Sequence, residues 1–326
     1  MKSGRLTLVS ENRRPTNPEK HHLLRELLRN LQELLRNLRR RDREPDRDLM
    51  QCSLGVQSCY KPQKISKVTF SKPAALLVVS GSKEIELAGR RFVAKAGELL
   101  IVPADTEFWI AKIPDSVSGL YQDLGFRFDI ETVQEFQRSY GRGLESWNLS
   151  SNWHAPASEA ELEWIIQWLD WGSKYPPSLH VQRHRLVELL LLLAQAGLAG
   201  NILVSRNPSW RRRIGQTIGV DPARAWRCQD LCRILGVSES AMRRHLRVEG
   251  TSFRDLLEET RLMSSLVLVQ ETSFTISRVA DGVGYRSQSR FTDRFKERFG
   301  VTPTMLRRSG SDVPGEFLVL GGGTLP

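Results

Sequence analysis

Hydrophobic and polar positions divide the chain into parts with different periods. Residues 66–127 contain short apolar or alternating runs, such as 75–79 and 99–102, with glycine or proline between them. This pattern predicts short β-strands joined by turns, as in a small barrel or jelly roll. Elsewhere apolar residues recur every three or four positions, which predicts amphipathic helices.

Three such helices are expected directly after the strands, over residues 130–140, 158–171 and 180–196. In the third, Leu191 and Leu192 extend the apolar surface beyond one side.

A leucine-rich segment with many arginines precedes the strands, between residues 17 and 48. Its helical stripe consists of Leu23, Leu24, Leu27, Leu28, Leu31, Leu34, Leu35 and Leu38. The stripe fits a short coiled-coil arm, a helix that binds a partner, or a helix on a membrane surface. Met50 directly precedes the strand pattern, so a natural start at that residue is a fourth interpretation.

The C-terminal third contains one arrangement twice: a short helix, a glycine turn and a second helix. In residues 230–250, Gly236 ends the first helix and Ser238 is the expected N-cap of the second. Met242 and Leu246 then lie four positions apart on its buried side. Residues 278–300 repeat the pattern with Gly284, Ser287, Phe291 and Phe295. The repetition predicts two helix-turn-helix units.

Both second helices carry polar and basic residues between their buried positions. Arginine binds guanine through two hydrogen bonds, glutamine binds adenine in the same way, and basic side chains neutralise phosphates. One such face is usually only solvated, but two of them after two glycine turns favour DNA binding. The candidate DNA-binding residues are Ser240, Arg243, Arg244 and Arg247 in the first unit and Gln288, Ser289, Arg290, Thr292, Arg294 and Lys296 in the second.

A single helix is expected between the two units, over residues 253–270. At about 1.5 Å per residue it is roughly 27 Å long. This length is close to one DNA turn of about 34 Å, so one chain is expected to enter two successive major grooves.

The 326 residues carry a net charge of +11, and the excess is uneven. Residues 206–308 contain 20 Lys and Arg against 11 Asp and Glu, whereas residues 50–205 contain 15 against 16. A nearly neutral middle joined to a basic end fits a sensing or assembly module tethered to a nucleic-acid reader.

Residues 210–308 resemble the DNA-binding domain of the AraC/XylS family of bacterial transcription regulators. The most specific part is the stretch Phe-Lys-Glu-Arg-Phe-Gly-Val-Thr-Pro at 295–303. The residues that carry the resemblance are Leu231, Gly236, Ser238, Met242, Leu246, Gly250, Arg261, Leu262, Ile276, Val279, Ala280, Gly284, Tyr285, Ser287, Phe291, Phe295, Lys296, Phe299, Gly300 and Pro303. It implies binding to double-stranded promoter DNA, activation, and RNA polymerase as a partner. It also implies base-facing positions for Ser240, Arg243, Arg244, Gln288, Ser289, Thr292 and Asp293.

Two positions depart from the family pattern. Residues 238–250 are one residue shorter than in most members, as in a subset that includes virulence and acid-stress regulators. Asp293 stands where many members have arginine, and a carboxylate there repels phosphate or selects cytosine. The first recognition helix is therefore expected to make more base contacts, and the second to hold phosphates through Arg290, Arg294 and Lys296.

Residues 96–103 resemble a cupin strand and turn, as in sensor domains of the same family. Metal-dependent cupins need histidines, but Phe108 takes the usual histidine place and residues 75–95 contain no histidine. We therefore expect no metal and no other cofactor. The domain is expected to receive either a small-molecule effector or a regulatory protein such as a chaperone.

The same resemblance implies a homodimer, because a helix near residues 180–196 commonly builds the dimer contact in AraC-like proteins. Its candidate residues here are Val181, Leu189, Leu190 and Leu193. Packing within the domain is an equal alternative for this helix.

Signals for catalysis and export are missing from the sequence. No Gly-rich phosphate loop or nucleophile elbow occurs, and none of the four cysteines follows proline, as in alkyl-transfer repair proteins. The first 20 residues contain no apolar export segment, and the run at 189–204 is too short and polar for a membrane span. A cytoplasmic protein that is not an enzyme and has no membrane partner is expected.

The sequence thus predicts an α+β protein with an N-terminal cupin-like β-barrel with dimerisation helices and a C-terminal all-α domain with two helix-turn-helix motifs. The expected function is sequence-specific transcription regulation, with activation favoured by the resemblance. The alternatives are an enzyme with a DNA-binding appendage and a non-specific nucleic-acid-binding protein. The expected segments are an arm at 1–49, a regulatory and dimerisation domain at 50–200, a linker at 201–209, a DNA-binding domain at 210–308 and a disordered tail at 309–326.

Overall fold

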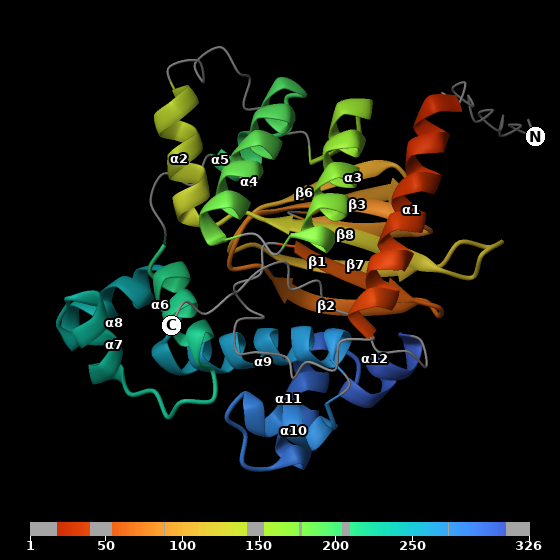
Figure 1. The fold of residues 1–326 in the computed structure, drawn as a ribbon. Coiled ribbons are helices and arrows are strands. Elements are labelled where there is room, and N and C mark those ends of the chain that lie inside the picture. The colour runs from red at the N-terminus through yellow and green to blue at the C-terminus, as the bar shows by residue number, and fades with distance from the viewer. Residues whose placement is uncertain are drawn as a thin grey trace, which may run out of the picture.

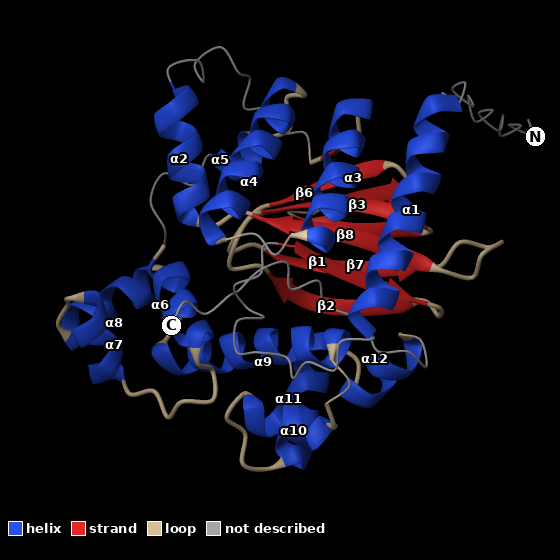
Figure 2. Ribbon diagram, in the orientation of Figure 1, coloured by secondary structure: helices blue, strands red, loops and turns tan. Residues whose placement is uncertain are grey.

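The computed structural model describes residues 18–39, 54–87, 89–141, 153–175, 178–203, 209–272 and 274–310. The predicted linker lies partly outside these residues, and the tail beyond 310 lies wholly outside them. A sheet domain with helices on one side is followed by a helical domain that lies below the sheets in Figure 1. Figure 2 shows the strands grouped in the first domain and only helices in the second.

The strands of the described residues form two separate antiparallel sheets that do not close into one barrel, so of the two predicted arrangements, a small barrel or a jelly roll, a closed barrel is not observed. The strands are β1 (Leu54–Cys59), β2 (Gln63–Thr69), β3 (Ala74–Ser80), β4 (Ser82–Leu87), β5 (Arg90–Lys95), β6 (Glu98–Val102), β7 (Glu107–Ile113), β8 (Tyr121–Arg127) and β9 (His154–Pro156). The larger sheet has the order β1-β8-β3-β6-β9 and the smaller one β2-β7-β4-β5. β3 to β8 lie within the predicted strand segment 66–127, whereas β1 and β9 lie outside it and β2 begins before it.

The central position of β3 in the larger sheet explains why its sequence is a continuous apolar run. It pairs with β6 and β8 on its two edges and is buried on both faces. Leu77 faces the core under the helices, whereas Leu76 faces the interior between the sheets, because successive side chains point to opposite faces of a strand.

Helices cover the outer face of the larger sheet. They are α1 (Pro18–Arg39), α2 (Ile130–Tyr140), α3 (Glu159–Lys174), α4 (Leu179–Gln195) and the short α5 (Gly200–Leu203). The bounds of α2 match the prediction, and those of α3 and α4 differ from it by one to three residues at each end. Serine N-caps at Ser158 and Ser178 fix where α3 and α4 begin.

α1 is not a free arm, because its leucines belong to the core of the sheet domain. Leu27 and Leu31 are fully buried and Leu23 nearly so. Gly97 shows how close the helix approaches: a Cβ there would lie 2.9 Å from the Leu24 Cδ1 atom. The side chains of Leu28, Leu34, Leu35 and Leu38 lie outside the described ones. The stripe therefore packs within the chain, and the three arm interpretations do not describe its main contact.

The interior between the sheets contains a buried ion pair. Lys83 Nζ of β4 lies 2.5 Å from Asp123 Oδ2 of β8, and both side chains are almost fully buried. The Tyr121 hydroxyl also donates to Asp123, and burial raises the Tyr121 pKa well above its usual value. This group crosses from one sheet to the other and ties them together.

The helical domain consists of α6 (Trp210–Val220), α7 (Cys228–Leu235), α8 (Glu239–Val248), α9 (Phe253–Glu271), α10 (Ile276–Gly282), α11 (Gln288–Phe299) and α12 (Pro303–Ser309). α9 runs between the two helix-turn-helix units in Figure 1. None of the described helices is long and apolar enough to cross a membrane.

The second unit is docked on the sheet domain through the β1–β2 turn and β2. The Ser309 carbonyl accepts hydrogen bonds from the backbone N–H groups of Tyr60 and Lys61, each at 3.2 Å. Arg298 Nη2 donates to Thr69 Oγ1 at 3.4 Å. Phe299 and residues of β2 belong to one continuous apolar cluster. The contact to the first unit is different, as described below.

Candidate nucleic-acid interface

The first helix-turn-helix unit is built as the sequence predicts. Gly236 ends α7 with φ of 67°, a left-handed conformation that glycine adopts without strain. Ser238 caps α8 by accepting from the Ala241 backbone N–H. Met242 and Leu246 are buried against α6 and α7, which turns the remaining positions of α8 outward.

All four candidate residues of α8 are exposed: Ser240, Arg243, Arg244 and Arg247. Arg243 is 70% exposed and lies 3.2 Å from Glu239 one turn earlier. An exposed pair of this kind is weak, about 0.3–0.5 kcal/mol, so it does not hold the guanidinium against a base or phosphate. The face is therefore free to bind an anionic surface.

The second unit repeats this geometry. Gly284 has φ of 82°, and a Cβ there would lie 2.7 Å from Arg261 Nη2. Arg261 itself donates to the carbonyls of Pro222 and Arg224 at 2.9 and 3.1 Å. The turn after α10 thus packs on an arginine that also holds the segment before α7, so both a positive φ and a close approach require glycine.

The candidates on α11 do not all share one environment. Gln288, Ser289, Arg290 and Lys296 are exposed, whereas Thr292 and Arg294 are half-buried. Arg294 lies 2.8 Å from Glu258 of α9 and 2.7 Å from Glu297. The exposed part of the basic face thus consists of the first turn of α11 and of Lys296 near the other end of the helix.

Sequence reasoning missed an ionic connection that joins α6 to the second unit through α9. Glu259 of α9 lies 2.6 Å from Arg211 of α6 and 3.3 Å from Arg298 of α11. These residues are about forty or more positions apart, and no local pattern marks such a pair. The connection fixes α6 and α11 to the same side of α9.

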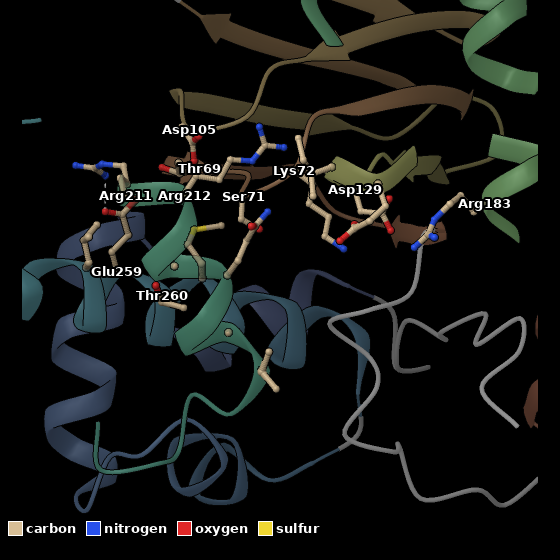
Figure 3. Close-up of a pocket in the computed structure, with 18 of the residues that line it drawn as sticks. Thr69, Ser71, Lys72, Asp105, Asp129, Arg183, Arg211, Arg212, Glu259 and Thr260 are labelled. Atoms are coloured by element: carbon tan, nitrogen blue, oxygen red, sulfur yellow. Dashed lines mark hydrogen bonds and ion pairs between the residues drawn. The ribbon is translucent and has the colours of Figure 1, made fainter. Parts of the chain in front are cut away.

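A cavity of about 380 Å³ lies between the sheet domain and α6. Figure 3 shows Lys72, Asp129 and Arg183 on one side and Arg211, Arg212, Glu259 and Thr260 on the other. Burial lowers the pKa of Lys72, which the nearby Asp129 opposes. The lining mixes both signs of charge with apolar side chains such as Met263.

The dimerisation candidates are divided by the structure. Leu189, Leu190 and Leu193 are buried in the core between α4 and the larger sheet. They cannot contact another protomer in this conformation, because the chain's own residues cover them. Val181 is 40% exposed and is the one of the four that remains accessible.

The described residues contain no group of three or more His, Cys, Asp or Glu that would hold a metal ion. Among the cysteines, Cys59 is buried between the sheets, and desolvation raises its pKa to about 11. A thiol in that state is a poor nucleophile. Cys232 is buried beside Met242 in the first unit, with 4.0 Å between the sulfur atoms, as expected for a core thiol.

The helical domain is similar to known regulators. Residues 231–309 match a family model described as a helix-turn-helix domain. The HTH-type transcriptional regulator GadX of Escherichia coli O6:H1 is 35% identical over 108 residues, which cover 33% of this chain and 39% of GadX. YdeO of Escherichia coli strain K12 is 30% identical over 125 residues, which cover 37% of this chain and 49% of YdeO. The chain thus spans less than half the length of these curated relatives.

The fold of both domains is similar to that of ToxT from Vibrio cholerae. One ToxT structure gives a TM-score of 0.57 at 14% identity and covers 79% of this chain and 98% of ToxT. Another, bound to an unsaturated fatty acid, gives 0.57 at 18% identity and covers 81% and 97%. The order of a sheet domain followed by a helical domain is thus shared with ToxT, and residues 231–309 form a helix-turn-helix domain similar in sequence to those of the regulators named above.

Proposed function

We propose that this regulator activates transcription by inserting α8 and α11 into successive major grooves of promoter DNA. The observation that carries the proposal is the pair of exposed polar and basic helices attached to one connecting helix. α9 has 19 residues, so at about 1.5 Å per residue it is roughly 28 Å long. That length suits two helices about one DNA turn apart.

The two recognition helices are assigned different tasks. α8 presents three exposed arginines and one serine, which suit direct contact with base edges. α11 presents Arg290 and Lys296 for phosphates and Gln288 and Ser289 at its first turn. Arg294 is assigned mainly to internal ion pairs, since both of its carboxylate partners lie within the domain.

Activation rests on a relative rather than on geometry. The urease operon transcriptional activator of Escherichia coli is 31% identical over 94 residues, which cover 29% of this chain and 32% of that protein. RNA polymerase is accordingly the proposed protein partner. Regulation is assigned to residues 50–200 and DNA reading to residues 210–308.

A small-molecule effector is proposed for the cavity between the domains. ToxT has been solved with an unsaturated fatty acid and with (E)-4-(8-methylnaphthalen-1-yl)but-3-enoic acid, both carboxylic acids with apolar parts. Here Lys72 and Arg183 offer cations beside apolar side chains such as Leu179. A regulatory protein on the sheet domain is the alternative control, and a homodimer through the exposed end of α4 near Val181 is the proposed assembly.

Selection of random duplexes by the full chain tests the function. Enrichment of two short motifs about 10 base pairs apart supports reading by both helices. A variant with Arg243→Ala and Arg244→Ala should lose one motif and keep the other. If the selected duplexes share no motif and binding depends only on salt, the chain is a non-specific nucleic-acid binder.

A further inference from the structure

One carboxylate of the sheet domain lies at the start of α6. Asp105 belongs to the turn between β6 and β7, and its Oδ2 atom is 3.5 Å from Ser209 Oγ. Ser209 is the N-cap of α6 and accepts from the Arg212 backbone N–H at 3.1 Å. The Ser209 hydroxyl therefore donates toward Asp105 while its oxygen caps the helix, so Asp105 contacts the helix start through one atom.

A second carboxylate reaches the same helix start from the recognition helix. Glu249, the C-cap of α8, accepts from the backbone N–H groups of Trp210 and Arg211 at 2.7 and 2.8 Å. His245 of α8 stacks on Trp210, with ring centroids 4.4 Å apart and planes 12° from parallel. Through these contacts α8 is attached to the first turn of α6, and α6 touches the sheet domain at Asp105.

The charged groups that face Asp105 come from two helices. Arg212 and Arg211 of α6 favour its ionised form, whereas Glu249 of α8 opposes it. Arg211 is already paired with Glu259 at 2.6 Å, and Arg212 is almost fully buried. Desolvation outweighs the two arginines and raises the pKa of Asp105 to about 6. Figure 3 shows Asp105 above α6 with Arg211 and Arg212 beside it.

We propose that Asp105 is a proton-sensitive contact that couples the sheet domain to the first recognition helix. When Asp105 is protonated, the seam between its turn and α6 is closed and α8 is held in one orientation. When Asp105 is ionised, the favourable hydration of its carboxylate favours opening of that seam. The seam is local, because the second unit is attached separately through Ser309, Tyr60 and Lys61.

The direction of the pH effect follows from the linkage between proton binding by Asp105 and closing of the seam. In an open seam the carboxyl is hydrated and has the ordinary pKa of about 3.9. The closed seam, with the higher pKa, binds the proton more tightly, so closing is favoured as the pH falls through about 6. The stabilisation of the closed seam by the bound proton is complete below about pH 4 and is lost above about pH 6. Between pH 7 and pH 5 the closing equilibrium should rise by about tenfold.

The effect of seam closing on DNA affinity rests on the proposed function. Both recognition faces remain exposed in the closed arrangement, so closing does not cover them. Closing holds α6 and α8 against the sheet domain in addition to the Glu259 connection with α11, which reduces the ordering that DNA binding must impose. Protonation of Asp105 should therefore tighten binding to a site with two motifs.

Asp105→Asn is the matched variant. Asparagine is neutral at every pH, keeps a polar contact to Ser209, and tolerates the φ of 57° found at this position. The control is Asp115→Asn, because Asp115 is an exposed carboxylate in the next loop and caps only its own turn.

The first experiment is a carboxyl carbon NMR titration of the full chain, with Asp105 assigned from the missing signal in Asp105→Asn. A midpoint near 6 supports the proposal, and a midpoint near 4 overturns it. Hydrogen exchange of the Trp210 and Arg211 amides, corrected for intrinsic rates, should slow by about tenfold between pH 7 and pH 5 relative to Asp105→Asn. Equal pH dependence in the two proteins contradicts coupling at the seam.

The second experiment measures Kd for a selected duplex. Asp105→Asn should bind more tightly than the wild-type chain at pH 7, the ratio of the two Kd values should shrink by up to about tenfold between pH 7 and pH 5, and the two proteins should become equal only below about pH 4. His245 is present in both proteins, so its contribution cancels in the ratio. Asp115→Asn should follow the wild type. A ratio near one at both pH values contradicts coupling to DNA, whereas failure of every protein to select DNA refutes the proposed function and leaves the NMR and exchange results as the test of the seam.

Discussion

Arg294 of α11 lies against Glu258 of α9, with 2.8 Å between Nε and Oε1. The same guanidinium reaches Glu297 at 2.7 Å, and these carboxylates raise its already high pKa further. The guanidinium of an arginine held in this way is oriented toward carboxylates of its own domain. Lys296, two positions later, is exposed, so neighbouring cations on one helix are expected to differ in function.

Salt dependence of DNA binding separates the two cations. Lys296→Ala should flatten the plot of log K against log salt concentration by about 0.9 units, because one phosphate contact is lost. Arg294→Ala should leave that slope almost unchanged and should lower stability by less than about 1 kcal/mol, since the pair is partly solvated. The measurements are fluorescence anisotropy over a salt series and urea unfolding. A slope that changes equally in both variants would show that Arg294 leaves its carboxylates to bind phosphate.

Arg243→Ala tests base reading by α8. We expect a loss of about 1–3 kcal/mol in binding free energy on the selected site and a relaxed preference at one base pair. The matched control is Arg233→Ala on α7, which removes an exposed arginine of the same unit away from the α8 face. A uniform loss on all sequences assigns Arg243 to a phosphate instead.

The helix-turn-helix units were predictable because their determinants are local. Gly236 and Ser238 fix a turn and a cap within a few residues, and Met242 and Leu246 mark the buried side by spacing alone. The predicted bounds of the connecting helix agree with those of α9 to within one residue for the same reason. Exposure of the candidate arginines on α8 then follows from the period of the helix.

Contacts between distant residues were not predictable in this way. The spacing of Leu27 and Leu31 defines a stripe but does not say whether a partner or the chain's own sheet covers it. The same ambiguity applied to Leu190, which lies in the core. The ion pair of Arg294 with Glu258 was not predicted, because the two residues are 36 positions apart. The choice between a small barrel and two sheets was left open by the sequence, because alternation predicts strands but not how their edges pair.

Leu27→Ala tests whether α1 is part of the domain. Leu27 is fully buried, so its truncation should cost about 2–5 kcal/mol of unfolding free energy. Arg29→Ala, on the exposed side of the same helix, should change stability by less than about 0.5 kcal/mol. Urea unfolding of the full chain measures both. Equal, small effects would mean that α1 leaves the sheet in solution and acts as an arm.

Asp123→Asn tests the ionic group between the sheets. The change leaves the Lys83 ammonium buried without its carboxylate, which should cost about 3–5 kcal/mol. The matched control is Glu84→Gln in the same strand as Lys83, because the partner of Glu84 is the exposed Arg91, and its loss should cost less than about 1 kcal/mol.

A double variant with Asp123→Asn and Lys83→Met removes the stranded charge and should recover much of the stability lost in the single variant. The measurement is again unfolding free energy, with retained binding to the selected duplex as the check that the helical domain is intact. If the double variant is no more stable than Asp123→Asn alone, the cost does not come from the unpaired Lys83 ammonium; the lost Tyr121 hydrogen bond, packing and the neighbouring buried Lys112 then account for it.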